Sequence, residues 1–116
     1  MDYLCINKEE TVLTALECIK KNHQRCVIVL NHSGKVDGVV SQGDIANALL
    51  NGTSQYAAVE KIMNPSFLYL TENDLDSAYA LFKKYQISLI PILNQKFELQ
   101  GVITIQDIFN YLEKRK

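Results

Sequence analysis

The sequence is poor in the residues that mark specialised classes of protein. It has three cysteines, two prolines, five glycines and no tryptophan in 116 residues, which excludes a disordered, collagen-like or low-complexity chain. Neither charge dominates, because 12 basic and 13 acidic residues leave a net charge of −1, whereas a nucleic-acid binder needs a basic face. No apolar run exceeds about five residues, which is too short for a membrane span. The first residues do not show the basic segment and following apolar stretch of a signal peptide. We therefore expect a soluble cytoplasmic protein without a membrane span or signal peptide.

The chain is long enough to build one ordinary hydrophobic core. Hydrophobic residues make up 47% of it, and a chain of this size buries roughly two-thirds of its unfolded surface. The same length leaves little room for a catalytic cleft on top of a scaffold. No nucleophile–base pair and no metal-binding cluster stands out in the sequence. We therefore expect a protein that is not an enzyme, without catalytic or metal-binding residues and without an obligatory cofactor.

Two kinds of potential ligand residue are read as structural. The three cysteines form no C-x-x-C pair, so the sequence supports neither a zinc site nor a redox motif. We expect Cys5, Cys18 and Cys26 to be buried and to pack as small hydrophobic residues. His23 and His32 have no partner at metal-ligand spacing, so we expect solvated residues at a helix end and a turn.

An internal repeat organises the chain. When the sequence is aligned with itself at an offset of 63 positions, Gly38 falls on Gly101 and Asp44 on Asp107. Apolar character is kept more widely than identity, and the three cysteines fall on Leu68, Leu81 and Leu89. Such a repeat sets the architecture before single elements are assigned. It predicts a first unit in residues 1–56 and a second in residues 57–116.

Each unit has the same predicted order of elements. A short extended piece, residues 4–6 or 67–70, precedes a helix whose apolar residues are spaced i, i+3, i+4 and i+7, as in Val12, Ala15, Leu16 and Ile19. Two strands follow, over 26–30 and 36–40 or 89–93 and 99–103, with Gly34 suited to positive φ in the first turn. A second helix starts near Gly43 or Gln106, and Gly52 is a plausible cap for its end in the first copy. Residues 58–63 of the linker are predicted to form a short helix that stops before Pro65.

The predicted fold is therefore α/β of the α+β type, with the order β-α-β-β-α occurring twice. Each unit would have a three-stranded sheet with one apolar side. About fifty residues with one covered face are marginally stable alone, so we expect the two units to pack together as one pseudo-twofold module. A ligand would then sit in the cleft between them, since pockets favour such interfaces.

The strand-to-helix junctions are the candidate functional sites. Ser41 and Thr104 each precede a helix and are followed three residues later by Asp44 and Asp107. This spacing is typical of a capping box, which stabilises a helix start by about 1 kcal/mol. The same groups also suit a nucleotide, because a helix N-terminus attracts phosphate and a carboxylate accepts hydrogen bonds from the two hydroxyls of a ribose. One aspartate is able to serve both purposes.

The junctions and the repeat carry a family resemblance. The motif Gly-h-h-Ser/Thr-x-x-Asp-h (h, apolar) occurs in both copies, and the strand Leu89–Leu93 contains a proline. Over nearly its whole length the chain resembles a tandem pair of CBS domains, a Bateman module. The resemblance implies a regulatory module that binds adenosine nucleotides such as AMP, ADP or ATP, and that often pairs with another module into a disc.

The resemblance also assigns roles to residues. It implies that Asp44 and Asp107 bind ribose hydroxyls and that Ser41 and Thr104 bind phosphate or ribose oxygens. Arg25 would contact phosphate, and its repeat counterpart Ser88 would be the corresponding ligand-binding residue of the second site. Because Ser88 is uncharged, we expect the first site to bind the ligand more tightly. Backbone around 26–27 and 89–90 would line the adenine slots. The family usually has proline where this chain has Ile28.

Finer expectations concern the partners. Residues 43–52 and 59–64 are similar to the N-terminal CBS pairs of sugar-nucleotide nucleotidyltransferases, which implies that an appended or partner enzyme of that kind is regulated. Leu50 and Phe109 lie off the main apolar stripe of their helices and predict a homodimer contact. The alternative is a dimerisation scaffold without a ligand, in which Asp44 and Asp107 only cap helices. We expect neither nucleic acid nor membrane as a partner.

Overall fold

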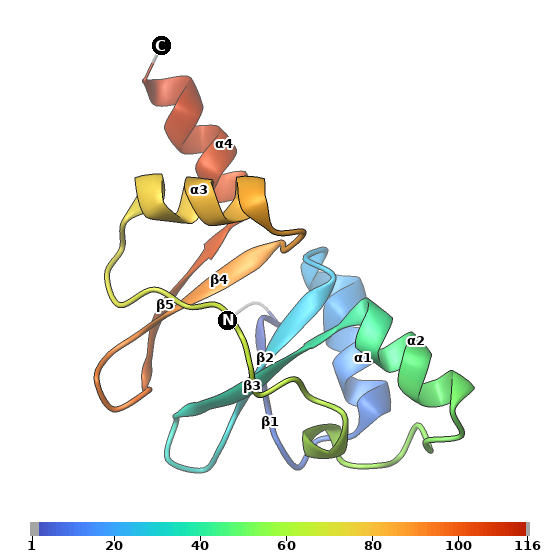
Figure 1. Cartoon of the computed structure of the whole chain (residues 1–116). Coiled ribbons are helices and arrows are strands. Elements are labelled where there is room, and N and C mark those ends of the chain that lie inside the picture. The colour runs from blue at the N-terminus through green and yellow to red at the C-terminus, as the bar shows by residue number, and fades with distance from the viewer. Residues whose placement is uncertain (1–2, 116) are drawn as a thin grey trace. The chain divides into compact units, whose positions relative to one another are not determined.

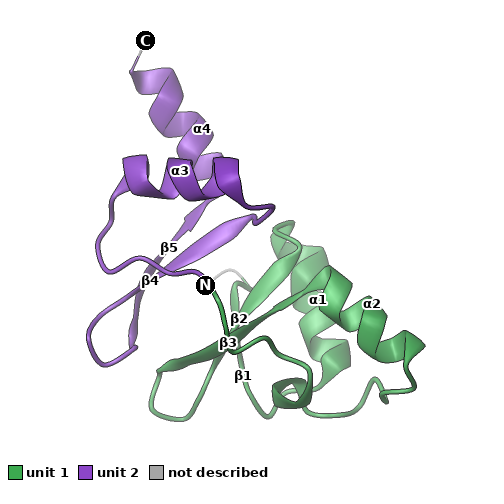
Figure 2. Cartoon of the chain, in the orientation of Figure 1, with its two compact units in different colours: residues 1–67 green, residues 68–116 purple. Residues whose placement is uncertain are grey.

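The structure is a computed structural model that describes residues 3–115. It divides into two compact units, Met1–Phe67 and Leu68–Lys116 (Figure 2). The first contains β1 (Cys5–Asn7), α1 (Val12–Asn22), β2 (Cys26–Leu30), β3 (Val36–Ser41), α2 (Gln42–Leu50) and a single 3₁₀ turn, η1 (Val59–Lys61). The second contains α3 (Leu75–Lys84), β4 (Leu89–Leu93), β5 (Leu99–Thr104) and α4 (Ile105–Lys114).

The first unit has a three-stranded sheet in the order β1-β2-β3 (Figure 1). β1 pairs with β2 in parallel and β3 pairs with β2 in antiparallel register, with a bulge between Val29 and Leu30. Buried and half-buried residues alternate along β3, as expected of a strand with one face on a core. Helix α1 adds Val12, Ala15 and Ile19 to that core, which confirms the predicted apolar stripe.

Local sequence explains where the helices begin and end. Thr11 caps α1, since its Oγ1 accepts the backbone N–H of Thr14 at 3.0 Å, and Asp74 caps α3 in the same way. Each such cap stabilises its helix by about 1 kcal/mol. Helix α2 ends before Asn51, and Gly52 follows at a φ of 91°, a conformation in which glycine has no steric penalty. The positive φ expected of Gly34 is confirmed at 75°.

The second unit differs from the prediction in its sheet. Among the described residues of this unit, only β4 and β5 form a ladder, and the expected third strand is reduced to one bridge in which Leu70 pairs with Ile92. The reason is Pro91, which the offset aligns with Ile28. Ile28 donates its backbone N–H to the carbonyl of Leu4 at 2.8 Å, but a proline has no N–H to donate. The α+β fold class and the repeated element order are otherwise confirmed.

The linker belongs to the core of the first unit. Val59 is fully buried there, and its backbone N–H bonds the carbonyl of Glu10 at 2.7 Å. Asn64 exchanges two backbone hydrogen bonds with Val39, at 2.8 and 3.1 Å, along the outer edge of β3. The helix predicted over 58–63 is only the turn η1, because Asn64 already pairs in extended conformation with Val39.

The cysteines follow the prediction in part. Cys18 is buried in the first core, whereas Cys5 and Cys26 are only half-buried, and all three are free thiols. Cys5 and Cys26 are the first residues of strands β1 and β2, so both side chains lie at the end of the sheet.

Candidate functional site

In the first unit the candidate site lies where β3 runs into α2. Ser41 is the N-cap of α2, and its Oγ accepts the backbone N–H of Asp44 at 3.0 Å. In return, Asp44 Oδ2 accepts the backbone N–H of Ser41 at 3.0 Å. This reciprocal pair is a capping box, so the structural interpretation of the Ser-x-x-Asp spacing is correct.

The capping box leaves part of the Asp44 carboxylate available. A carboxylate has about four acceptor positions on two oxygens, and within residues 3–115 only Oδ2 accepts a hydrogen bond. The side chain is half-buried at the N-terminus of α2, where the positive end of the helix dipole stabilises negative charge. The box therefore fixes the carboxylate and leaves Oδ1 free to accept hydroxyl groups.

Arg25 is held next to this junction. Its backbone carbonyl accepts the N–H of Gln42, the first residue of α2, at 2.8 Å. Its φ is 63°, a left-handed conformation that is uncommon for a side chain of this size and that tends to persist at functional sites. Because β2 begins at Cys26 and pairs there with Ser41, Arg25, Ser41 and Asp44 meet at one end of the sheet.

The thiol of Cys26 is not a nucleophile at this site. Burial, and then the negative charge of Asp44, raise its pKa to about 12. The thiolate is the reactive form of cysteine, so the side chain stays protonated and unreactive at neutral pH. It contributes packing beside Asp44.

The equivalent junction of the second unit is more exposed. Thr104 caps α4, and the capping box with Asp107 is present, the N–H of Thr104 lying 2.8 Å from Oδ2. The hydroxyl of Thr104 also donates to this oxygen, at 3.1 Å, so Oδ2 of Asp107 accepts one more hydrogen bond than Oδ2 of Asp44 does. The backbone carbonyl of Ser88 accepts the N–H of Ile105 at 3.1 Å, as the carbonyl of Arg25 accepts the N–H of Gln42, but the residue at this position is uncharged.

An open depression adjoins the first junction. It has a volume of about 490 Å³, and its lining residues are Leu16, Ile19, Lys20, His23, Arg25 and Gln42. The sequence does not predict this depression, because it indicates only a solvated helix end at His23. His23 is indeed the C-cap of that helix, with a φ of 60°, but it faces the same space as Arg25. The signal was present in the repeat, where His23 and Arg25 align with the uncharged Gln86 and Ser88.

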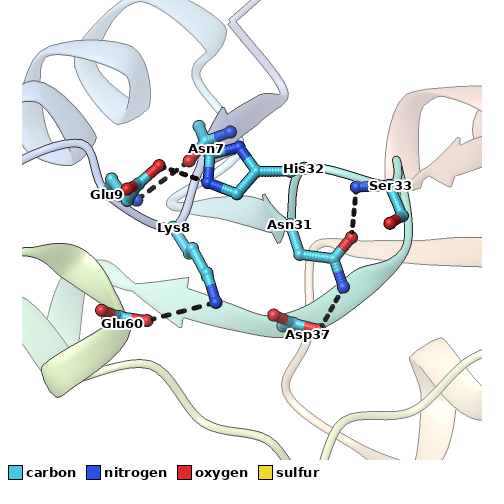
Figure 3. Close-up of polar contacts among 8 residues, drawn as sticks. All are labelled: Asn7, Lys8, Glu9, Asn31, His32, Ser33, Asp37 and Glu60. Atoms are coloured by element: carbon cyan, nitrogen blue, oxygen red, sulfur yellow. Dashed lines mark hydrogen bonds and ion pairs between the residues drawn. The ribbon is translucent and has the colours of Figure 1, made fainter.

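The opposite end of the same sheet is occupied by polar contacts among its loops (Figure 3). His32 Nε2 lies 2.7 Å from Glu9 Oε1, and Lys8 Nζ lies 3.7 Å from Glu60 Oε2. Lys8 and Glu60 are of opposite charge and pair with each other. Within residues 3–115 no three histidine, cysteine or acidic side chains gather in a way that would hold a metal ion.

The order of elements, the two capped junctions and the internal repeat define a tandem pair of small α+β units. The sequence model of the CBS domain matches residues 1–51 and again residues 59–114. The chain therefore belongs to the CBS domain family and contains two copies of the domain. Within the part of the chain that the structure describes, no helix is long and apolar enough to cross a bilayer.

Curated relatives are much longer than this chain. It is 27% identical over 88 residues to the magnesium transporter MgtE of Thermus thermophilus, covering 75% of this chain and 18% of the transporter. It is 26% identical over 111 residues to the L-aspartate semialdehyde sulfurtransferase of Methanosarcina acetivorans, covering 95% of this chain and 22% of that enzyme. The match thus spans about a fifth of each relative.

Solved structures share the fold. The CBS domain pair of protein MJ0100, in complex with 5-methylthioadenosine and S-adenosyl-L-methionine, has a TM-score of 0.77 and 21% identity over 97% of this chain and 90% of that one. A CBS domain protein from Pyrobaculum aerophilum, complexed with AMP, has a TM-score of 0.75 and 19% identity over 96% and 91%. The cytosolic domain of the Mg²⁺ channel MgtE, in complex with ATP, has a TM-score of 0.73 and 22% identity over 95% and 45%.

Proposed function

We propose that the chain is a regulatory module that binds an adenosine nucleotide and controls an attached or partner enzyme. The ligand would be AMP, ADP or ATP, and its main site would be the β3–α2 junction of the first unit. The family membership supports a regulatory module, and the adenosine ligands of the solved structures support the class of ligand.

The observation that carries the proposal is the half-buried carboxylate of Asp44, fixed by Ser41 with one oxygen free. Two vicinal hydroxyls of a ribose would donate to this carboxylate, each in a charge-assisted hydrogen bond. The N-terminus of α2 and the guanidinium of Arg25 would attract the phosphate. The ribose and the phosphate would each meet a chemically suitable group.

The second unit offers the same groups in a weaker form. Asp107 is exposed and accepts an additional bond from the Thr104 hydroxyl, and Ser88 stands where the first unit has Arg25. We therefore expect the first site to be occupied at lower nucleotide concentration than the second.

A ligand screen tests the proposal directly. Thermal unfolding would be followed with AMP, ADP, ATP, S-adenosylmethionine and, as a control, GMP. A ligand that binds the folded state at a hundred times its Kd stabilises that state by about 2.7 kcal/mol, so the midpoint should rise clearly with at least one adenosine ligand. No shift with any adenosine compound at millimolar concentration would reject the proposal.

The role of Arg25 in binding phosphate has its own test. We expect Arg25→Ala to weaken AMP far more than adenosine, because only the phosphate gains from the guanidinium. Isothermal titration calorimetry of both ligands measures the two losses separately. Equal losses for AMP and adenosine would show that Arg25 only shapes the site.

The regulated enzyme is a finer part of the proposal. The resemblance of residues 43–52 and 59–64 to nucleotidyltransferase-linked pairs favours a sugar-nucleotide nucleotidyltransferase as the attached or partner domain, in the cytoplasm. Joint purification of the chain with such an enzyme, and an activity that responds to AMP, would support this assignment.

A homodimer is proposed as the assembly, and a dimerisation scaffold without ligand is the second candidate function. Leu50 is 86% exposed and Phe109 53% exposed, and large apolar side chains left in water favour contact surfaces. The ligand screen separates the two functions, because a scaffold would dimerise without any nucleotide-dependent stabilisation.

A further inference from the structure

Met63 lies where the linker closes over the core of the first unit. Its side chain is half-buried and packs against that core. Its backbone N–H bonds the carbonyl of Val59 at 3.0 Å, just after η1. The next residue, Asn64, forms the bridge to Val39. The side chain of Met63 therefore lies between the turn that enters the core, at Val59, and the bridge that covers the outer edge of β3.

The thioether of Met63 has no spare space on the side of β3. A Cβ built at Gly38 would lie 3.1 Å from both Cγ and Sδ of Met63, and 2.8 Å from the carbonyl oxygen of Asn64. Carbon atoms in favourable contact are about 3.5–4.0 Å apart. The missing side chain of Gly38 is therefore what allows the sulfur and the Asn64 backbone to approach the strand so closely.

The second unit shows that this close approach belongs to the linker and not to the repeat. The offset aligns Gly38 with Gly101. Within residues 3–115, a Cβ built at Gly101 would meet only Cδ1 of Ile92, at 3.5 Å, which is an ordinary contact. Both copies have the glycine, but the close contact with a sulfur atom occurs at Gly38.

The sulfur of Met63 is open to a kind of oxidation that does not require a thiolate. A thioether has no proton to lose, whereas a thiol reacts as its thiolate. Burial raises the pKa of the thiols of Cys5, Cys18 and Cys26, which lowers their thiolate fraction at neutral pH. Because Met63 is only half-buried, it lies within reach of a small peroxide.

We propose that Met63 is a modification site, at which oxidation to the sulfoxide by hydrogen peroxide releases residues 62–64 from β3. The sulfur attacks one peroxide oxygen, so that an S–O bond forms as the O–O bond breaks. A proton passes from the attacked oxygen to the departing one, which leaves as water. The sulfur loses two electrons and the peroxide gains them, and the apolar side chain becomes a polar one.

The sulfoxide does not fit the place of the thioether. On the side of β3 the space at Gly38 is already too small for a Cβ, and toward the core the new oxygen would face apolar side chains without a hydrogen-bond donor. To reach water, the side chain must turn away from Gly38, which pulls Asn64 from Val39. The freed edge lies two residues before Ser41, where β3 ends. Reduction of the sulfoxide restores the thioether, so the change is reversible.

The experiment treats the full chain and its Met63→Leu variant with hydrogen peroxide at about pH 6, where thiols react slowly. Leucine retains an apolar side chain of similar volume and has no sulfur. Peptide mass spectrometry locates the added oxygen and separates Met63 from Met1, the other methionine of the sequence.

We expect oxidation to lower the unfolding midpoint of the wild type by at least about 4 °C. The amides of Val39 and Asn64 should exchange with deuterium at least about tenfold faster, as measured by NMR, because the bridge opens. Treatment with methionine sulfoxide reductase should reverse both changes. Peroxide should alter neither the midpoint nor these amides in Met63→Leu.

Three results would overturn the inference: no added oxygen at Met63 in the folded chain, an oxidised Met63 without faster exchange at Val39 and Asn64, or the same loss of stability in Met63→Leu. If Met63→Leu does not fold, the reductase decides instead: recovery of slow exchange at these two amides supports the inference, and no recovery overturns it. No measurement here uses a nucleotide, so the inference stands or fails separately from the proposed function.

Discussion

Asp44 should contribute to stability and to nucleotide binding through different properties, and two substitutions separate these contributions. Asp44→Ala removes the acceptor of the Ser41 N–H, whose hydrogen bond measures 3.0 Å, together with the negative charge at the start of α2. The loss of such a cap costs about 1 kcal/mol, which lowers the unfolding midpoint by about 4 °C for a chain of this size. Asp44→Asn retains an oxygen that accepts this bond and should lose only about half as much.

Nucleotide affinity should respond differently to the same two variants. Both remove the charged acceptor of the ribose hydroxyls, and a hydrogen bond to a charged group contributes about 1.5–3 kcal/mol, so both should weaken AMP about tenfold to a hundredfold. Calorimetric titration with AMP and thermal unfolding by circular dichroism measure the two effects on the same samples. Asp107→Asn, the matched change in the second unit, should alter affinity far less. If Asp44→Asn bound AMP as the wild type does, Asp44 would only cap the helix.

Three further predictions follow from packing, burial and exposure. Gly38→Ala should destabilise the chain by about 1–3 kcal/mol in urea unfolding, since its Cβ would lie 2.8 Å from the carbonyl oxygen of Asn64; the repeat-matched Gly101→Ala should cost clearly less, and equal costs would contradict this. Because burial raises the pKa of Cys26 to about 12, the native thiol should react slowly with a disulfide reagent up to pH 9 and rapidly in urea; labelling that follows an ordinary thiol pKa in the native state would refute the burial. Leu50→Glu should lower the molar mass measured by light scattering from about 26 kDa, twice the 13.2 kDa of one chain, toward that of the monomer. An unchanged mass would exclude the Leu50 side chain from the proposed dimer contact.

The element order and both helix caps could be predicted because they depend on local sequence. The spacing of apolar residues defines the α1 stripe, and a hydroxyl three residues before a carboxylate is sufficient to build the capping boxes at Ser41 and Thr104. These interactions lie within four residues of each other, so no knowledge of the tertiary fold is needed. The internal repeat also predicted that the second unit has the same order of elements as the first.

The features that the sequence did not predict depend on distant contacts. The missing strand of the second unit follows from Pro91, whose effect appears only when its neighbour in the sheet is known. The burial of Val59 follows from its contact with a loop about fifty residues earlier in the chain, at Glu10. The depression depends on the C-cap of α1 and the first residue of α2 facing the same space, which no local pattern encodes.

The bridge between Asn64 and Val39 affects how the two units meet other chains. In the first unit these two backbone hydrogen bonds cover the outer edge of β3. The offset places Val102 of β5 at the position of Val39, and within residues 3–115 no segment forms the equivalent bridge there. An uncovered edge strand is a template on which another strand adds. Under partly denaturing conditions, intermolecular β-pairing should therefore begin on β5 and spare β3, and the charge introduced by Val102→Lys on this strand should act as a gatekeeper against aggregation.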